Sequence, residues 1–167
     1  PLASEAKIRS LFNLWNAALA TGDSRIVAKR YSKDPILLPT VSDTPRTDFA
    51  SIKDYFDNFL KLKPQGVILE GKITVGQDWA KDAGIYEFTM GADGRKVKAR
   101  YSFVYVLENG DWKINHHHSS VMPEASQKKG PAITEDEVRN LFHLWNDALD
   151  TLDSDLVAKR YAKKPVL

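Results

Sequence analysis

The densest group of polar side chains is the run from Asn115 to Ser120. It reads Asn-His-His-His-Ser-Ser and ends a segment rich in aromatic and β-branched residues. Because successive side chains of a strand point to opposite faces, His116, His118 and Ser120 would share one face. A neutral imidazole can accept a proton, and a hydroxyl can orient a water molecule. The cluster therefore predicts a polar pocket at the end of the last strand. The alternatives are histidines that cover a sheet edge or that meet another subunit.

A His-x-His pair on a strand can also bind zinc, which requires at least a third protein ligand. Residues 4–124 contain no histidine outside this run, and the chain contains no cysteine. His143 corresponds to Asn13 in the internal repeat described below, so it is not a repeated ligand. A carboxylate would have to complete a metal site. We therefore expect a pocket without a cofactor and keep a metal site as the alternative.

The turn at Asn109-Gly110 decides which side chains of the preceding strand meet the histidines. A two-residue turn would place Tyr101 beside His118. A three-residue turn with a bulge at Gly110 would place Arg100 beside His118 instead.

The second register would also place Ser102 beside His116. We favour this second register because it gathers four apolar residues into one core and leaves the polar side chains together at the end of that core. These four are Val104, Val106, Trp112 and Ile114.

Three further side chains could close the pocket. The hydroxyl of Thr40 can bind a small ligand or its own backbone. Arg46 could meet an anion or pair with Asp43, and the ion pair is favoured. Tyr55 lies on the inner stripe of a predicted helix, where its ring would join the core and its hydroxyl would need a partner.

The periodicity of apolar residues predicts the elements that position these groups. Helices are expected at residues 5–20, 23–31 and 49–62. Strands are expected at residues 35–39, 67–76, 79–90, 96–107 and 112–121. Helices followed by a run of antiparallel strands predict an α+β fold with three helices packed on one face of a curved antiparallel sheet.

An internal repeat divides the chain. When the sequence is shifted by 130 residues, Ser4–Leu37 aligns with Thr134–Leu167 without gaps, and 20 of the 34 positions are identical. We predict a complete unit at residues 4–124, a linker at 125–133 and an incomplete second copy, the first two helices, at 134–167. The apolar stripe of the second copy is expected to dock on its own or a neighbouring domain.

Composition excludes several classes of function. The net charge is +2, and the basic residues form only isolated pairs, which argues against nucleic-acid binding. No apolar run is long enough to cross a membrane. We expect a soluble globular protein.

Three segments carry a more specific pattern. They are Leu37–Thr47, Asp54-Tyr55-Phe56 and Gly110–Glu124, the last ending in His-His-His-Ser-Ser-Val-Met-Pro-Glu. Over nearly all of residues 4–124 the chain resembles the calcium/calmodulin-dependent kinase II association-domain family, whose fold is the cone of nuclear transport factor 2 and its SnoaL-like relatives. Within that family it is most similar to the iota-class carbonic anhydrases.

The resemblance implies reversible hydration of CO₂ to bicarbonate. It implies a catalytic set of Thr40, Tyr55, His118 and Ser120, with Ser102, His116, Arg100 and Arg46 as candidate substrate-binding neighbours. The class is described both as using manganese or zinc and as metal-free, and the histidine count favours a metal-free site. The resemblance also implies a homodimer or larger homo-oligomer. Tandem domains are typical of algal members, which points to a chloroplast, with a bacterial cytoplasm or periplasm as the alternative.

Two other functions remain open at this point. The domain could be an oligomerisation hub without catalysis, with Tyr101, Phe103 and Tyr105 as a buried interface on the outer face of the sheet. It could instead be a SnoaL-like cyclase or isomerase. An Asp or Glu inside the cone would favour that reading, and the sequence pattern identifies none.

Overall fold

The first helix buries a single apolar stripe. In a computed structural model that describes residues 1–126 and 134–163, α1 spans Glu5–Ala20, and the hydroxyl of Ser4 caps it by accepting from the backbone N–H of Lys7. The short helix α2 (Ser24–Ala28) follows and is capped by Asp23. Its buried residues continue the stripe of α1 toward the first strand.

Five strands form one sheet in the order β1-β5-β4-β3-β2. They are β1 (Tyr31–Leu38), β2 (Pro64–Val75), β3 (Trp79–Met90), β4 (Lys96–Glu108) and β5 (Asp111–Val121). The predicted α+β class is confirmed, but the sheet is mixed, because β1 pairs with β5 in parallel and the other neighbours are antiparallel. A parallel pair requires a long crossover connection. Here α3 and strands β2 to β4 provide it.

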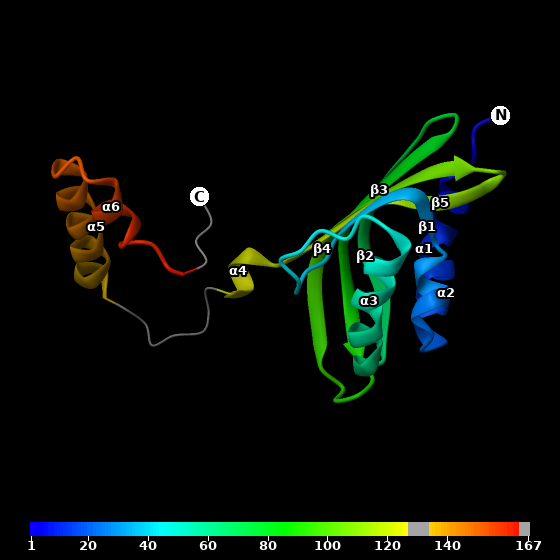
Figure 1. The fold of residues 1–167 in the computed structure, drawn as a ribbon, viewed down its shortest axis with the longest axis horizontal. Helices are drawn as coiled ribbons and strands as arrows, with labels where there is room; N and C mark the ends of the chain where they lie inside the picture. Colours follow the sequence, from blue (N-terminus) through cyan, green and yellow to red (C-terminus); the bar gives the residue numbers. More distant parts are fainter. Residues whose placement is uncertain (127–133, 164–167) are drawn as a thin grey trace. The chain divides into compact units, whose positions relative to one another are not determined.

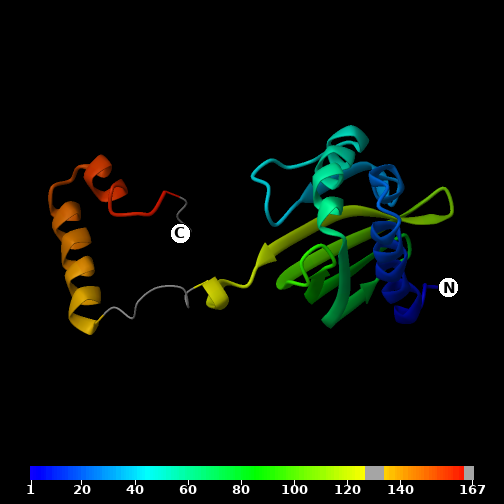
Figure 2. The same cartoon turned by 90° about the horizontal axis from the view of Figure 1, so that it is seen from below.

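The helices cover one face of this curved sheet, and the core lies between the two layers (Figure 1, Figure 2). The core residues of α1 and α3 meet inward-facing residues of the sheet, and β2 contributes the buried Pro64 and the partly buried Ile68 and Ile73. Among the described residues of the first unit, no helix lies on the opposite face of the sheet (Figure 2). The α3 helix spans Phe49–Phe59, and Asp48 and Ser51 form a capping box at its start. The last turn predicted for it is a separate 3-10 helix, Leu60–Leu62.

The β4–β5 hairpin has neither of the two registers predicted from sequence. Its turn has two residues, because Asn109 and Gly110 both have positive φ (52° and 82°) and Glu108 pairs with Asp111. The favoured three-residue turn is therefore wrong.

A bulge changes the register further along the hairpin. Tyr105 pairs with Ile114 and Val104 pairs with His116, so Asn115 is the extra residue on β5. The side-chain amide of Asn115 donates to the carbonyl oxygen of Asp34 at 2.9 Å, which fixes the bulge against β1. Beyond it, the faces of β5 are exchanged relative to the predicted alternation.

The chain divides into two units, Pro1–Pro123 and Glu124–Leu167. In the second, α5 (Glu135–Asp150) and α6 (Ser154–Ala158) have the bounds of α1 and α2 displaced by 130 residues. A short helix, α4 (Pro123–Ser126), lies where the predicted linker begins. Most of the predicted linker and the last four residues of the second copy lie outside the described residues. Among the described residues, no helix has the length and apolar character needed to cross a membrane.

Candidate functional site

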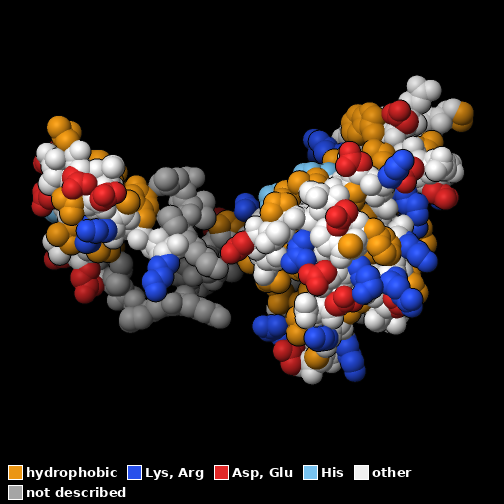
Figure 3. Space-filling model, in the orientation of Figure 1, with side chains coloured by type: hydrophobic (Ala, Val, Ile, Leu, Met, Phe, Trp, Pro, Cys, Tyr) orange, Lys and Arg blue, Asp and Glu red, His pale blue; other side chains and the backbone are white. Residues whose placement is uncertain are grey.

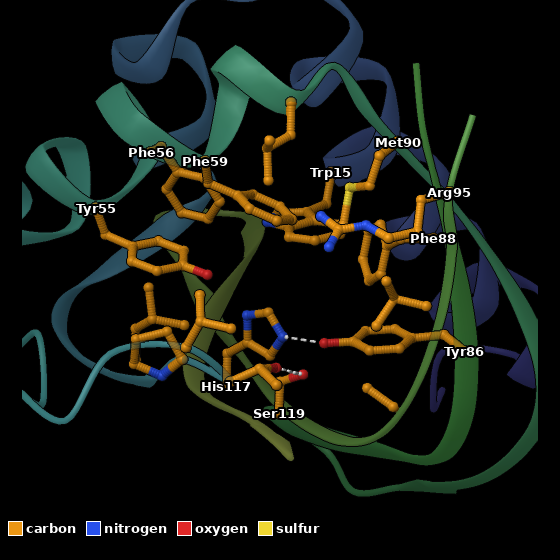
Figure 4. A pocket seen from close by; sticks show the side chains of 17 residues that line it. Trp15, Tyr55, Phe56, Phe59, Tyr86, Phe88, Met90, Arg95, His117 and Ser119 are labelled. Carbon is orange, nitrogen blue, oxygen red and sulfur yellow. Dashed lines mark hydrogen bonds between the residues drawn. The ribbon is translucent and has the colours of Figure 1, made fainter. Parts of the chain in front are cut away.

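A cavity of about 200 Å³ lies between the helices and the inner face of the sheet. Aromatic and aliphatic side chains form most of its wall, and a few polar groups gather on one side (Figure 4). The lining residues are Trp15, Leu37, Pro39, Thr40, Val41, Tyr55, Phe56, Phe59, Leu62, Tyr86, Phe88, Met90, Arg95, Val97, Ala99, His117 and Ser119. A small apolar molecule that needs a few hydrogen bonds would match this wall.

His117 is the most constrained of the polar groups. Its ring is 3 % exposed and stacks on Phe103, with ring centroids 4.1 Å apart. The hydroxyl of Tyr31 lies 2.9 Å from Nδ1, and that of Tyr86 lies 3.2 Å from Nε2. Burial lowers the pKa of His117 to about 3, helped by the neighbouring histidines on β5. The imidazole is therefore neutral at physiological pH and is held from both sides.

Ser119 is two residues further along the inner face of β5 and is also buried. The hydroxyl of Thr40, which follows β1, donates to Ser119 Oγ at 2.5 Å. A serine hydroxyl can accept one hydrogen bond and still donate another. Ser119 is thus positioned to donate toward the cavity, and Figure 4 shows it beside His117.

Tyr55 contributes a second hydroxyl from α3. Burial raises the pKa of Tyr55 to about 12, although the guanidinium of Arg46 acts in the opposite direction. The phenol remains a protonated donor at any physiological pH, and its oxygen points into the cavity (Figure 4).

Arg46 supports Tyr55 from outside the cavity. Its guanidinium lies over the ring of Tyr55, 5.9 Å from the centroid, and forms an ion pair with Asp54 at 2.8 Å. It also donates to the carbonyl oxygen of Ser51 and to the hydroxyl of Ser42. Arg46 is not among the residues that line the cavity. The structure therefore does not place it in contact with a bound substrate, as predicted, but against the ring of Tyr55.

Besides Arg46, the structure separates the other seven predicted site residues into two groups. Thr40 and Tyr55 line the cavity, as expected. Five others lie together on the outer face of the sheet, where Ser102 pairs with His118 and Arg100 pairs with Ser120. These five are Arg100, Ser102, His116, His118 and Ser120. The predicted placement of His118 and Ser120 inside the pocket is therefore wrong, because the bulge at Asn115 turns His117 and Ser119 inward instead.

The aromatic residues of β4 could have indicated the inner face. Tyr101, Phe103 and Tyr105 are 4 %, 0 % and 1 % exposed, so they form core and not the outer interface proposed from sequence. Across from them, Phe103 pairs with His117 and Tyr101 with Ser119. Aromatic alternation thus marks the inward face of β4. A bulge, by contrast, has no reliable signature in a single sequence.

The described residues contain no group of three or more His, Cys, Asp or Glu side chains that could hold a metal ion. The single imidazole in the cavity already has a tyrosine hydroxyl at each ring nitrogen, and no carboxylate lines the cavity. These residues do not fit the zinc or manganese that the family resemblance left open. Arg95, from the loop between β3 and β4, is the charged lining residue.

One carboxylate is nevertheless buried inside the fold. Asp82 is 1 % exposed and accepts a hydrogen bond from the hydroxyl of Tyr101 at 2.8 Å. Burial raises its pKa. Asp82 is not among the residues that line the cavity, so it is not placed as a base for a ligand bound there.

A curved sheet with helices on one face and a cavity between them is the nuclear transport factor 2-like, or cystatin-like, fold. A protein with this fold from Novosphingobium aromaticivorans superimposes with a TM-score of 0.59 at 13% identity, covering 71% of this chain and 81% of that one. The family model of the calcium/calmodulin dependent protein kinase II association domain matches residues 4–123. The chain therefore belongs to this association-domain family.

Two solved structures refine the comparison. A protein of Xanthomonas campestris, described as an association domain of this family, is 45% identical, with a TM-score of 0.70 over 73% of this chain and 90% of that one. The iota-carbonic anhydrase from a cyanobacterium, complexed with bicarbonate, is 19% identical, with a TM-score of 0.63 over 72% and 93%. No curated protein matched the chain.

Proposed function

We propose that the chain is a carbonic anhydrase and that Thr40, Tyr55, His117 and Ser119 form its site. The observation that carries this proposal is a set of neutral hydroxyl and imidazole groups in a small, mostly apolar cavity whose charged lining residue is Arg95. Membership of the association-domain family and the shared fold with the cyanobacterial iota-carbonic anhydrase support it.

The reaction joins a water oxygen to the carbon of CO₂ and releases one proton. CO₂ is apolar and suits the aromatic wall formed by residues such as Phe56 and Phe88. As the new C–O bond forms, negative charge develops on the CO₂ oxygens. The hydroxyls of Ser119 and Tyr55 are aimed into the cavity as donors and can stabilise that charge. Because burial raises the pKa of Tyr55 to about 12, this donor is retained at alkaline pH.

His117 holds the hydroxyls of Tyr31 and Tyr86 in place and does not accept the proton. An imidazole with a pKa of about 3 is too weak a base at neutral pH, so our expectation of a histidine base near its ordinary pKa does not apply to this ring. The proton passes to a second water molecule and then to solvent. His117 keeps the phenol of Tyr86 in place through its contact at Nε2.

The rate should be modest. We propose a metal-free reaction that relies on positioning and hydrogen bonding, without a metal to lower the pKa of the attacking water. A chelator should then leave the activity unchanged.

The test is a CO₂ hydration assay on the purified chain with substitutions on the two faces of β5. Ser119→Ala should lower kcat/KM by roughly 100-fold, the loss expected for one oxyanion donor. The matched variant Ser120→Ala removes the same hydroxyl from the outer face and should retain full activity. Equal losses in both variants, or loss of activity with the chelator, would contradict this site.

We also propose that the family's association function operates through the outer face of the sheet. Three of its side chains, Ala83, Ile85 and Val104, are only half-buried, and the helices of the first unit lie on the other face of the sheet. A homodimer through this face would bury them. Val104→Asp should lower the mass measured by light scattering, while Lys7→Asp, on the exposed surface of α1 and away from this face, serves as the charge control and should leave the mass unchanged.

A further inference from the structure

Arg95 is the one charged side chain among the described residues that line the cavity. Its side chain is 59 % exposed, and Val41, another lining residue, is 77 % exposed, so the cavity reaches solvent beside these two residues. Figure 4 shows the guanidinium pointing toward the cavity from the side of Met90 and Phe88. The hydroxyls and the imidazole that line the same cavity are neutral at physiological pH. Arg95 therefore supplies the positive charge that a ligand meets at the mouth of the cavity.

Backbone hydrogen bonds hold the loop that carries Arg95 against the end of α3. The N–H groups of Gly91 and Ala92 donate to the carbonyl oxygens of Lys63 and Leu62, at 2.8 Å and 3.1 Å. A Cβ on Gly91 would lie 3.0 Å from the carbonyl oxygen of Lys63, which leaves little room for a side chain there. The position of Arg95 relative to the cavity is thus fixed by contacts between two elements that line it.

Asp93 orients Arg95 from two residues earlier in the same loop. Its carboxylate accepts from the backbone N–H of Arg95 at 2.9 Å and lies 3.8 Å from the guanidinium Nε. Both side chains are more than half exposed, so water screens this ion pair. Because the contact with Asp93 is made at Nε, the two terminal nitrogens of Arg95 can donate side by side to a planar anion.

The side chains around the loop also favour an anion. Residues 60–63 and 91–96 together carry one acidic side chain, that of Asp93, and four basic ones. Figure 3 shows mostly basic side chains at the end of the first unit where Figure 1 places the β3–β4 loop and the end of α3. A mouth with an excess of one sign of charge raises the local concentration of ions of the opposite sign. The four basic residues are Lys61, Lys63, Arg95 and Lys96.

Hydration of CO₂ converts a neutral substrate into a monoanion. Neutral hydroxyl donors can bind either species, whereas a guanidinium interacts strongly only with the anion. We propose that Arg95 is a specificity-determining residue that binds the oxygens of bicarbonate at the mouth of the cavity. Asp93 limits this binding because its carboxylate competes for the same guanidinium. The inference rests on the proposed carbonic anhydrase function, which supplies the anion.

The contribution of Arg95 appears in the binding of the anion and not in the direction of the reaction. Hydration and dehydration share one transition state, and kcat/KM measures its free energy relative to the free reactants. The overall equilibrium between CO₂ and bicarbonate therefore fixes the ratio of kcat/KM in the two directions, whatever residue is changed. The equilibrium dissociation constant of bicarbonate has no such constraint, so it is the quantity to measure.

The test is a titration of the full chain with sodium bicarbonate at slightly alkaline pH and constant ionic strength. The amide NMR resonances of Tyr55 and Ser119, which line the cavity, report the binding. Arg95→Gln should raise the dissociation constant about fivefold, the upper range for an exposed ion pair. Asp93→Asn should lower it about twofold, because the amide oxygen still accepts from the N–H of Arg95 but no longer competes as a charge.

The chain offers a closely matched control on α2. Arg25 pairs with Asp23 two residues earlier, and the N–H of Arg25 donates to that carboxylate at 2.9 Å, as in the loop. Arg25 does not line the cavity. Arg25→Gln therefore makes the same change in net charge and should leave the dissociation constant of bicarbonate unchanged.

A second titration with nitrate, a planar monoanion that is not a substrate, separates this inference from the proposed function. Nitrate should rank the variants in the same order as bicarbonate. If both anions bind in this order and the wild-type chain does not hydrate CO₂, the carbonic anhydrase proposal fails and the anion site stands. If the wild type is active but Arg95→Gln binds bicarbonate as tightly, or no more weakly than Arg25→Gln, the role assigned to Arg95 is overturned.

Discussion

Acidification should destabilise the first unit through His117. The unfolded chain binds a proton on this side chain near pH 6.5, whereas burial holds the pKa in the folded state at about 3. Between these values the unfolded state binds more protons, so stability is fully present above pH 6.5 and declines as the pH falls. At about pH 5 this group alone should lower the free energy of unfolding by about 2 kcal/mol.

Urea unfolding of wild type and His117→Gln, followed by near-ultraviolet circular dichroism at a series of pH values, would measure this effect. The glutamine amide can still accept from one tyrosine and donate to the other, but it does not titrate. The wild-type midpoint should fall by about 1 M urea more than that of the variant between pH 7.5 and about pH 5.

Comparison with the variant cancels the contributions of the other titrating groups to the pH dependence of stability. Burial raises the pKa of Asp82. Its effect on stability is opposite to that of His117, because acidification neutralises an unfavourable buried charge. His116, whose pKa is lowered, acts in the same direction as His117. Both groups are present in both proteins. If the two stability curves remained parallel over this pH range, the neutral, buried state assigned to His117 would be refuted.

Three further outcomes follow from the same geometry. A Cβ on Gly84 would lie 1.9 Å from the carbonyl oxygen of Glu70, so Gly84→Ala should cost about 3 kcal/mol in urea unfolding. Gly94→Ala, which meets only open space at φ 76°, should cost about 1 kcal/mol, and similar losses would contradict the packing argument. Arg46→Lys should lower kcat/KM about tenfold without changing the fold, because Tyr55 loses its guanidinium support. Unchanged activity would make Arg46 dispensable. Finally, kcat/KM should vary less than about twofold between about pH 6.5 and about pH 9, since neither His117 nor Tyr55 titrates there. A distinct ionisation in this range would point to another group as the base.

The sequence was sufficient for the class of fold and for most of the elements, but it placed the first strand at residues 35–39 instead of Tyr31–Leu38 and did not predict its parallel pairing with β5. The α1 helix was predicted with the correct bounds, because helical periodicity is a local property of the sequence. The β3 strand was predicted with the correct bounds, and β4 and β5 differ by one residue at one end. Thr40 and Tyr55 line the cavity as expected, although β1 begins four residues before the predicted strand and α3 ends three residues before the predicted end.

Only the tertiary structure determines which side chains of β5 in the last hairpin point into the cavity. The chain contains the run of histidines and serines, which was enough to locate the cluster on β5. Which members point inward depends on one extra residue, Asn115, and on the hydrogen bond that it makes to the carbonyl oxygen of Asp34 on β1. That contact joins residues 81 positions apart. Since side chains alternate with a period of two, this single long-range contact exchanges His118 for His117 in the cavity.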